Sequence, residues 1–128
     1  MPLLQFDTTL TLDSARKESF ADFVRETYAE RMRTGTSHVA VTVREHDDAA
    51  LSIGRGVEGD CLFLDAEVRR GRDDETKRDF ALAVMEHVHE EYGVPTPNLK
   101  VVFTEHRGPS MMGYERVGGA WSPEEGGE

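Results

Sequence analysis

The feature that most constrains the fold of this chain is an internal repeat with an offset of 60 residues. When the sequence is shifted by that offset, similar residues align: Asp13 with Asp73, Lys17 with Lys77, Phe20-Ala21 with Phe80-Ala81, Val24 with Val84 and Val41 with Val101. Each copy, at about 2–45 and 61–104, has the pattern of two strands joined by a helix. Because such a crossover is right-handed and makes its two strands parallel, two copies predict an α/β (α+β) fold. That fold is a tandem β-α-β repeat, a four-stranded mixed sheet with both helices on one face.

The hydrophobic pattern gives the expected bounds of these elements. Apolar and β-branched residues predict strands at 2–8, 38–44, 61–68 and 99–104. Apolar residues at helical spacing predict helices at about 14–33 and 74–92. Asp13 and either Asp73 or Asp74 suit the helix N-caps, and Gly93 suits the residue after the second helix.

The remaining segments complete a single domain over 1–121. We expect a short strand at 51–53, a short helical turn at 108–114, and an acidic disordered tail at 122–128. Two helices cover only one face of a sheet. For so short a chain, the expected cover of the other face is another copy of the same chain.

Composition excludes several classes of function. The chain has 128 residues and a formal net charge of −10, which disfavours binding to nucleic acid or to an anionic membrane. No apolar run is long enough for a membrane span, and no signal-peptide pattern is present. A single cysteine allows no disulfide framework, so the expected location is the reducing cytoplasm. The single cysteine, Cys61, lies in an apolar run and is expected to be a small buried hydrophobe. The acidic, lysine-poor composition suggests a halophilic protein, because high salt relieves repulsion between like charges.

Pro2 opens the first predicted strand. If Met1 is removed, Pro2 carries a free secondary amine at the tip of that strand. Burial among apolar neighbours disfavours the charged form of an amine and lowers its pKa towards neutrality, where a general base works best. The alternative is that Pro2 is a strand-edge proline with no chemical role.

The segment Arg69-Arg70-Gly71-Arg72 lies between the third strand and the second helix. Ligand sites in β-α-β units collect at this position, and the planar guanidinium group suits a substrate carboxylate. The repeat aligns these arginines with Thr9 to Leu12, so the two copies differ here. The alternative is a solvated basic turn that pairs with the acidic residues after it.

Other motifs carry no function in this chain. Gly54 to Gly59 spells G-x-G-x-x-G, but a strand follows it where a dinucleotide site requires a helix. The five histidines show no metal-ligand spacing. We therefore expect neither a metal nor a cofactor.

A strand that starts at Pro2, a duplicated β-α-β unit and an arginine pair after the third strand together resemble the tautomerase superfamily. The similarity is closest to the malonate semialdehyde decarboxylase group at residues 2–7, and to the cis-3-chloroacrylic acid dehalogenase group at 35–38 and 69–72. The resemblance implies a homotrimer in which Pro2 is the catalytic amine and Arg69 and Arg72 bind a carboxylate. The further substrate-binding positions are Arg70, Tyr28, His38, Phe103 and Tyr114.

The expected function is a proline-dependent tautomerase (isomerase) that moves a proton between the keto and enol forms of a small 2-oxo acid or unsaturated carboxylate. The residues of the two hydrolytic groups are not all kept: His38 stands where the decarboxylase has an aspartate, and Val102 and Gly113 where the dehalogenase has a tyrosine and a glutamate. A dehalogenase, hydratase or decarboxylase of three-carbon acids is therefore the alternative within the superfamily. A non-catalytic anion-binding domain that retains Met1 is the alternative outside it.

Overall fold

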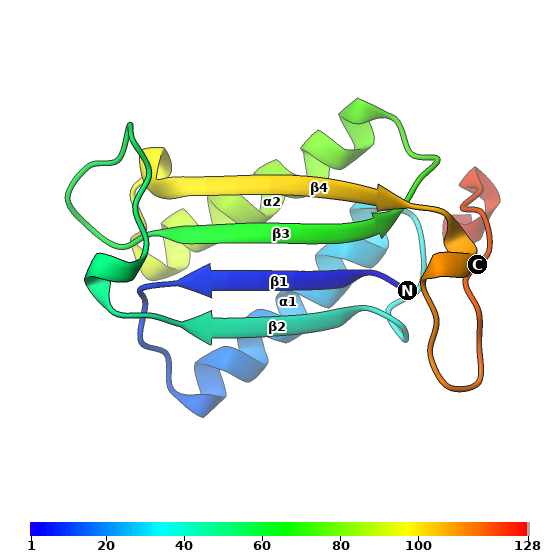
Figure 1. Cartoon of the computed structure of the whole chain (residues 1–128), viewed down its shortest axis with the longest axis horizontal. Helices are drawn as coiled ribbons and strands as arrows, with labels where there is room; N and C mark the ends of the chain where they lie inside the picture. Colours follow the sequence, from blue (N-terminus) through cyan, green and yellow to red (C-terminus); the bar gives the residue numbers. More distant parts are fainter. Residues whose placement is uncertain (128) are drawn as a thin grey trace.

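The computed structural model describes residues 1–127 and confirms the predicted architecture. The four strands form one sheet in the order β2-β1-β3-β4, and Figure 1 shows both helices behind it. In chain order the elements are β1 (Leu3–Thr8), α1 (Ser14–Arg31), β2 (Ala40–Glu45), β3 (Leu62–Arg69), α2 (Asp74–Tyr92) and β4 (Leu99–His106).

The pairing of the strands decides which residues meet at each end of the sheet. β1 runs parallel to β2 and β3 runs parallel to β4, whereas the central pair β1 and β3 is antiparallel. The start of β1 therefore lies beside the end of β3, where Leu3 pairs with Glu67. This register brings Pro2 and the arginine-rich segment after β3 to the same end of the molecule.

The two helices repeat the same local structure at the predicted offset. α1 starts at Ser14 and α2 starts 60 residues later, at Asp74. The Asp13 carboxylate accepts a hydrogen bond from the Arg16 N–H at 2.8 Å, and the Asp73 carboxylate accepts one from the Thr76 N–H at the same distance. Each aspartate thus caps a free donor of the first helical turn. Gly93 adopts a φ of 70° after α2, a left-handed conformation that glycine adopts without strain.

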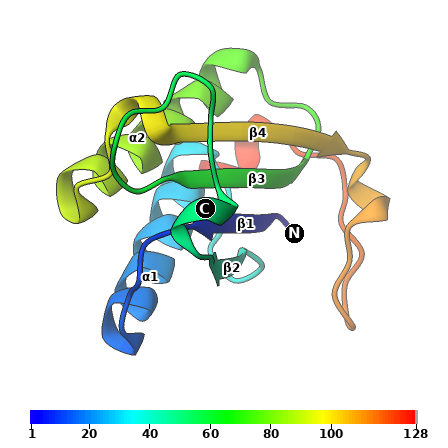
Figure 2. The same ribbon diagram turned by 60° about the vertical axis from the view of Figure 1, so that its left-hand side comes forward.

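The core lies between the sheet and the helices. Alternate residues of β1 and β3 point towards the helices and are buried, Leu4, Phe6, Leu64 and Ala66 among them. Aromatic rings from both helices fill the space in edge-to-face contacts, such as Phe6 with Phe20 and Tyr28 with Phe80. Figure 2 shows the opposite sheet face free of helices. On this open face the strands carry mostly polar side chains.

Three segments differ from the sequence predictions. Residues 51–53 do not form a strand, although Leu51 is buried, and a 3-10 turn at Asp48–Ala50 precedes them. The helical turn predicted at 108–114 is limited to Gly108–Ser110, and Met112 then pairs with Val117 in an antiparallel bridge. Where a disordered tail was expected, Pro123–Gly127 forms a 3-10 helix, and Glu128 lies outside the described residues. No helix within 1–127 is long and apolar enough to cross a membrane.

Candidate functional site

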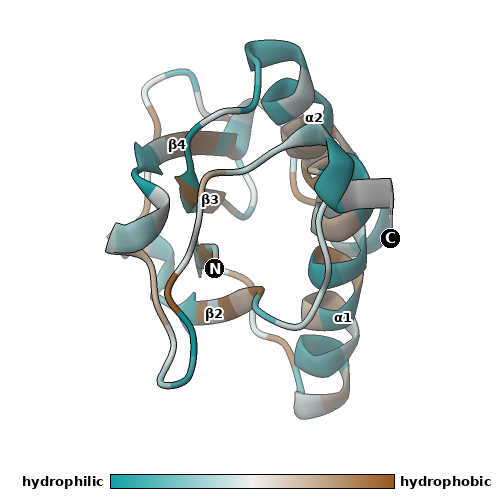
Figure 3. Ribbon diagram, turned by 90° about the vertical axis from the view of Figure 1, so that its right-hand side faces the viewer, coloured by the Kyte–Doolittle hydropathy of each residue, from teal (hydrophilic) through white to brown (hydrophobic). Residues whose placement is uncertain are grey.

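A cavity of about 260 Å³ opens at the end of the sheet where β1 begins and β3 ends. Its wall comes from Met1 and Pro2, the loop before β2, the end of β3, the segment after the Met112–Val117 bridge, and the C-terminal segment. Figure 3 views this end of the molecule, with the start of the chain between the loop that follows β4 and the C-terminal segment beside the helices. Three of the predicted site residues, Pro2, His38 and Arg69, line this cavity together.

Arg69 is the best-anchored cation in the cavity. Its side chain is 8% exposed. One terminal nitrogen donates a hydrogen bond to the Gly119 carbonyl at 2.9 Å, and the other donates to the Glu125 carboxylate at 2.6 Å. Gly119 reaches this position because it passes close to Gly108, where a Cβ atom would lie 2.2 Å from the Gly119 carbonyl oxygen.

Arg72 lies behind the cavity wall and is not among the residues that line it. Its Nε donates to the Met32 carbonyl at 2.6 Å, at the end of α1, and its two terminal nitrogens have no hydrogen-bond partner among residues 1–127. The guanidinium group lies 5.6 Å from the ring centre of Tyr28 and 4.8 Å from that of Trp121. Tyr28 is itself buried in the core, and this burial raises the pKa of its hydroxyl to about 12.

The other predicted substrate-binding residues lie away from the cavity wall. Phe103 faces the helices and contacts the core, with its ring 6.4 Å from that of Phe80. Arg70 is exposed, and its backbone N–H bonds to the His106 carbonyl. Tyr114 is fully exposed at the tip of the loop after β4, in a shallow surface depression that it shares with His38 and Arg116. The structure thus does not bring these three residues together with Pro2 and Arg69.

Two charged residues of the cavity were missed by the sequence analysis. Arg116 lines the wall and approaches the His38 ring nitrogen at 3.4 Å, and Glu125 bonds both Arg69 and the Thr34 hydroxyl. Both lie beyond the repeated units, where no periodic pattern assigns a residue to a face. The only sequence feature that pointed to these residues was charge, since the C-terminal glutamates follow a segment that is rich in glycine.

The cavity lowers the pKa of an amine at the start of β1. Burial, together with the positive charges of Arg69 and Arg72, lowers the pKa of the Met1 amino group to about 6. The negative charge of Glu125 acts in the opposite direction. An amine in this environment is largely uncharged at neutral pH and can accept a proton. Within residues 1–127 no three His, Cys, Asp or Glu side chains gather as a metal ion would need.

Comparison with known proteins bears on the fold. No protein-family model and no curated protein sequence matches the chain. Among solved structures, N1, a member of the cis-3-chloroacrylic acid dehalogenase family, superposes with a TM-score of 0.83 at 21% identity over 96% of this chain and 87% of its own. A malonate semialdehyde decarboxylase superposes with a TM-score of 0.73 at 18% identity, over 89% of this chain and 92% of its own.

Two further similar structures extend the comparison. A macrophage migration inhibitory factor from Toxoplasma gondii superposes with a TM-score of 0.77 at 16% identity, over 90% of this chain and 98% of its own. A fused 4-OT, described as a symmetric trimer, superposes with a TM-score of 0.75 at 17% identity, over 92% of this chain and 97% of its own. These matches confirm that the chain has the fold of the tautomerase superfamily.

Proposed function

We propose that this protein is a tautomerase that moves a proton between the keto and enol forms of a small 2-oxo acid or unsaturated carboxylate. The observation that carries the proposal is the cavity that Pro2 shares with Arg69. It combines a strand end where an amine has a lowered pKa with a buried guanidinium group. Proton abstraction beside a carbonyl needs both: a neutral base, and a cation for the charge that develops on oxygen.

The proposed base is the secondary amine of Pro2, set free when Met1 is removed. In the first step, neutral Pro2 takes the proton from the carbon beside the substrate carbonyl. The bonding electrons move onto the carbonyl oxygen and form an enolate. In the second step the protonated Pro2 gives the proton to the enolate oxygen, which yields the enol. Ketonisation runs the same two steps in reverse, with the proton taken from the enol oxygen and delivered to carbon, so the reaction consumes nothing and releases an isomer.

Three arginines would bind the substrate carboxylate, stabilise the enolate and lower the pKa of the amine. Arg69 is the proposed partner of the substrate carboxylate, because its planar fork matches two carboxylate oxygens. Arg116 also lines the cavity, and its positive charge stabilises the enolate. Arg72 adds a buried positive charge behind the wall, which disfavours the charged form of the amine.

The first test compares the ketonisation of phenylenolpyruvate by the wild type and by Pro2→Ala. We expect the variant to lose about 10²- to 10⁴-fold in kcat/KM, the range for loss of a general base. N-terminal mass measurement of both proteins must first establish that Met1 is absent, because a retained methionine blocks the amine. Equal rates in the two processed proteins would remove Pro2 from the mechanism, and a retained Met1 would favour the non-catalytic anion-binding domain.

The second test is the pH dependence of the same reaction. The active form of the base is the neutral amine, so kcat/KM should rise with pH while the amine loses its proton, and then level off. Because burial and the two arginines lower the pKa of the Met1 amine to about 6, we expect the Pro2 amine, in the same environment, to titrate well below the usual range for an amine. A rate that rises only above pH 8 would contradict this environment.

We also propose that the protein assembles as a homotrimer. The open face of the sheet exposes Leu3 and Val102, at 37% and 48% exposure, between polar side chains. Assembly through this face would cover what the two helices leave open, and trimers are described for the similar fused 4-OT structures. Sedimentation equilibrium measures the mass directly, and a monomer at micromolar concentration would contradict the proposal.

A further inference from the structure

The C-terminal segment Gly119–Glu125 contacts both arginines of the predicted carboxylate site. The Gly119 carbonyl and the Glu125 carboxylate accept hydrogen bonds from Arg69 at 2.9 and 2.6 Å. Between these two residues, the Trp121 ring lies 4.8 Å from the guanidinium carbon of Arg72. The Trp121 ring N–H donates to the Arg33 carbonyl at 3.0 Å, which fixes the ring against the end of α1. One short segment therefore covers both cations.

Glu125 occupies the position that a substrate carboxylate would need. A single oxygen of Glu125 accepts hydrogen bonds from Arg69 and from the Thr34 hydroxyl, the latter at 2.7 Å. Both the Glu125 side chain and Pro2 line the same cavity. Although burial raises the pKa of Glu125, the bonds from Arg69 and Thr34 outweigh it and lower that pKa overall, which keeps the carboxylate charged. With Glu125 in place, both terminal nitrogens of Arg69 already donate to groups of the C-terminal segment.

In the covered site, the guanidinium group of Arg72 is not fully hydrogen-bonded. The residue is 5% exposed, and in the part of the chain that the structure describes both terminal nitrogens lack a hydrogen-bond partner. Leaving a buried charged donor unpaired is costly, and contacts with two aromatic faces compensate only in part. Withdrawal of Trp121 would open the outer side of this guanidinium group to an anion.

We infer that the segment Gly119–Glu125 is a built-in cover of the carboxylate site, in which Glu125 competes with the substrate carboxylate for Arg69. The inference rests on the proposed function in that it takes the ligand of the cavity to be a carboxylate. A ligand must displace the cover, so its apparent affinity is reduced by the fraction of molecules in which the site is open. Removing the competing charge should therefore tighten binding.

The test compares Glu125→Gln with Glu124→Gln, and uses pyruvate as the probe. Glu124 lies next to Glu125 in the same 3-10 helix but is exposed, so it is a control with the same change of charge. Trp121 is the only tryptophan, so its fluorescence reports on the segment itself. We expect Glu125→Gln to lower the dissociation constant of pyruvate by about three- to tenfold, as suits one partly exposed ion pair, and Glu124→Gln to leave it unchanged. Pyruvate should also change the Trp121 emission of the wild type.

The outcomes separate this inference from the proposed function. If the wild type ketonises phenylenolpyruvate but Glu125→Gln binds pyruvate no more tightly, the competitor role is wrong and the function stands. An equal gain in pyruvate affinity in Glu124→Gln would also overturn the competitor role, since the effect would then come from net charge alone. Weaker binding in Glu125→Gln would assign Glu125 to holding Arg69 in place. If neither the wild type nor Glu125→Gln binds pyruvate, the competitor role is wrong, and the proposed function is then wrong only if the wild type also fails to ketonise phenylenolpyruvate. Thermal melting of both variants confirms that they are folded.

Discussion

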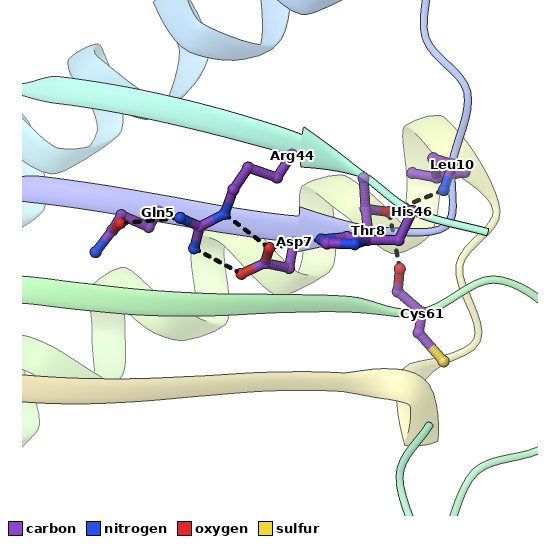
Figure 4. Close-up of polar contacts among 7 residues, drawn as sticks. All are labelled: Gln5, Asp7, Thr8, Leu10, Arg44, His46 and Cys61. Carbon is purple, nitrogen blue, oxygen red and sulfur yellow. Dashed lines mark hydrogen bonds and ion pairs between the residues drawn. The ribbon is translucent and has the colours of Figure 1, made fainter. Parts of the chain in front are cut away.

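The two ends of the sheet are built on the same repeated frame, but the site residues Pro2, His38 and Arg69 at one end have uncharged counterparts at the other. With the offset of 60 residues, Pro2 corresponds to Leu62, His38 to Asn98, and Arg69 to Thr9. At the second end, Thr9 accepts a hydrogen bond from the Cys61 N–H and donates one to Asp60, while Thr8 donates to the Cys61 carbonyl (Figure 4). Short bonds made by the hydroxyl groups of Thr8 and Thr9 thus close this end.

The segments that cover the two ends are held in different ways. After β2, residues 46–61 are fixed by Asn98, which is fully buried and exchanges hydrogen bonds with Val57 in both directions at 2.8 Å. After β4, the segment 107–125 is held by Arg69, which donates to Gly119 and Glu125, and by Trp121, which donates to the Arg33 carbonyl. The Asn98 amide is uncharged and already bonded to backbone groups of Val57 and Asp60, whereas a guanidinium group can exchange one carboxylate for another. The difference between the ends is therefore in the side chains, since the backbone frame is shared.

We expect the largest loss of stability when a core residue that the two halves share is replaced. Phe20 and Phe80 are equivalent in the repeat and are 2% and 0% exposed. Each makes edge-to-face contacts with two other aromatic rings. We expect Phe20→Ala and Phe80→Ala each to lower the free energy of unfolding by about 3–5 kcal/mol. Urea unfolding measures both, and a loss confined to one variant would break the equivalence of the halves.

The next effect should separate the two ends. Replacing Arg69 by Met removes the carboxylate partner, and we expect kcat/KM to fall by about 10²- to 10³-fold. Asn98→Ala removes the buried amide at the other end and leaves its partners unpaired, so it should lower the free energy of unfolding by about 2–3 kcal/mol. Its kcat/KM should stay at the wild-type value. A loss of activity in Asn98→Ala would show that the ends are coupled.

The contrast between the repeated frame and the side chains at its ends also explains how much of the fold and of the site could be predicted from the sequence. The frame was accessible because the repeat places apolar residues at the spacing of strands and helices, and the N-caps Asp13 and Asp73 fix where the helices start. Pro2 and Arg69 were accessible because they lie at strand ends, which the topology brings together, and His38 was assigned from the resemblance to the tautomerase superfamily. Arg116 and Glu125 lie outside the repeat, so only tertiary contacts place them. Phe103 was assigned to the cavity wall, but the alternation of β4 directs it to the helices.

A smaller effect should come from exchanging one residue between the halves. Thr8 corresponds to Val68, and both are fully buried. The Thr8 hydroxyl donates to the Cys61 carbonyl at 2.8 Å and accepts from the Leu10 N–H at 3.0 Å. Thr8→Val keeps the shape but leaves the Leu10 donor unpaired, so we expect a loss of about 1–2 kcal/mol in the free energy of unfolding. Chemical denaturation checks this, and an unchanged midpoint would mean that water or another group replaces the hydroxyl.

The smallest expected effect concerns two carboxylate–histidine contacts on the open face of the sheet. Asp7 bonds His46, and its counterpart Glu67 bonds His106, both at 2.7 Å. Only the first half adds Arg44, which donates two hydrogen bonds to the Asp7 carboxylate at 2.9 and 3.0 Å (Figure 4). The Arg44 bonds are the main cause of the lowered pKa of Asp7, with His46 contributing less.

This arrangement predicts how Arg44 affects stability in acid. A carboxylate with a lowered pKa stabilises the fold above its unfolded pKa, near 4, and this contribution disappears as the pH falls through the folded pKa. Arg44→Thr, which copies Thr104 of the second half, should therefore lower the melting temperature by about 1–2 °C at pH 7, and by less at pH 3. Arg78→Thr is the control, because it removes the same charge from an exposed position of α2. If the two variants lose the same amount at every pH, then the contact with Asp7 adds nothing beyond net charge.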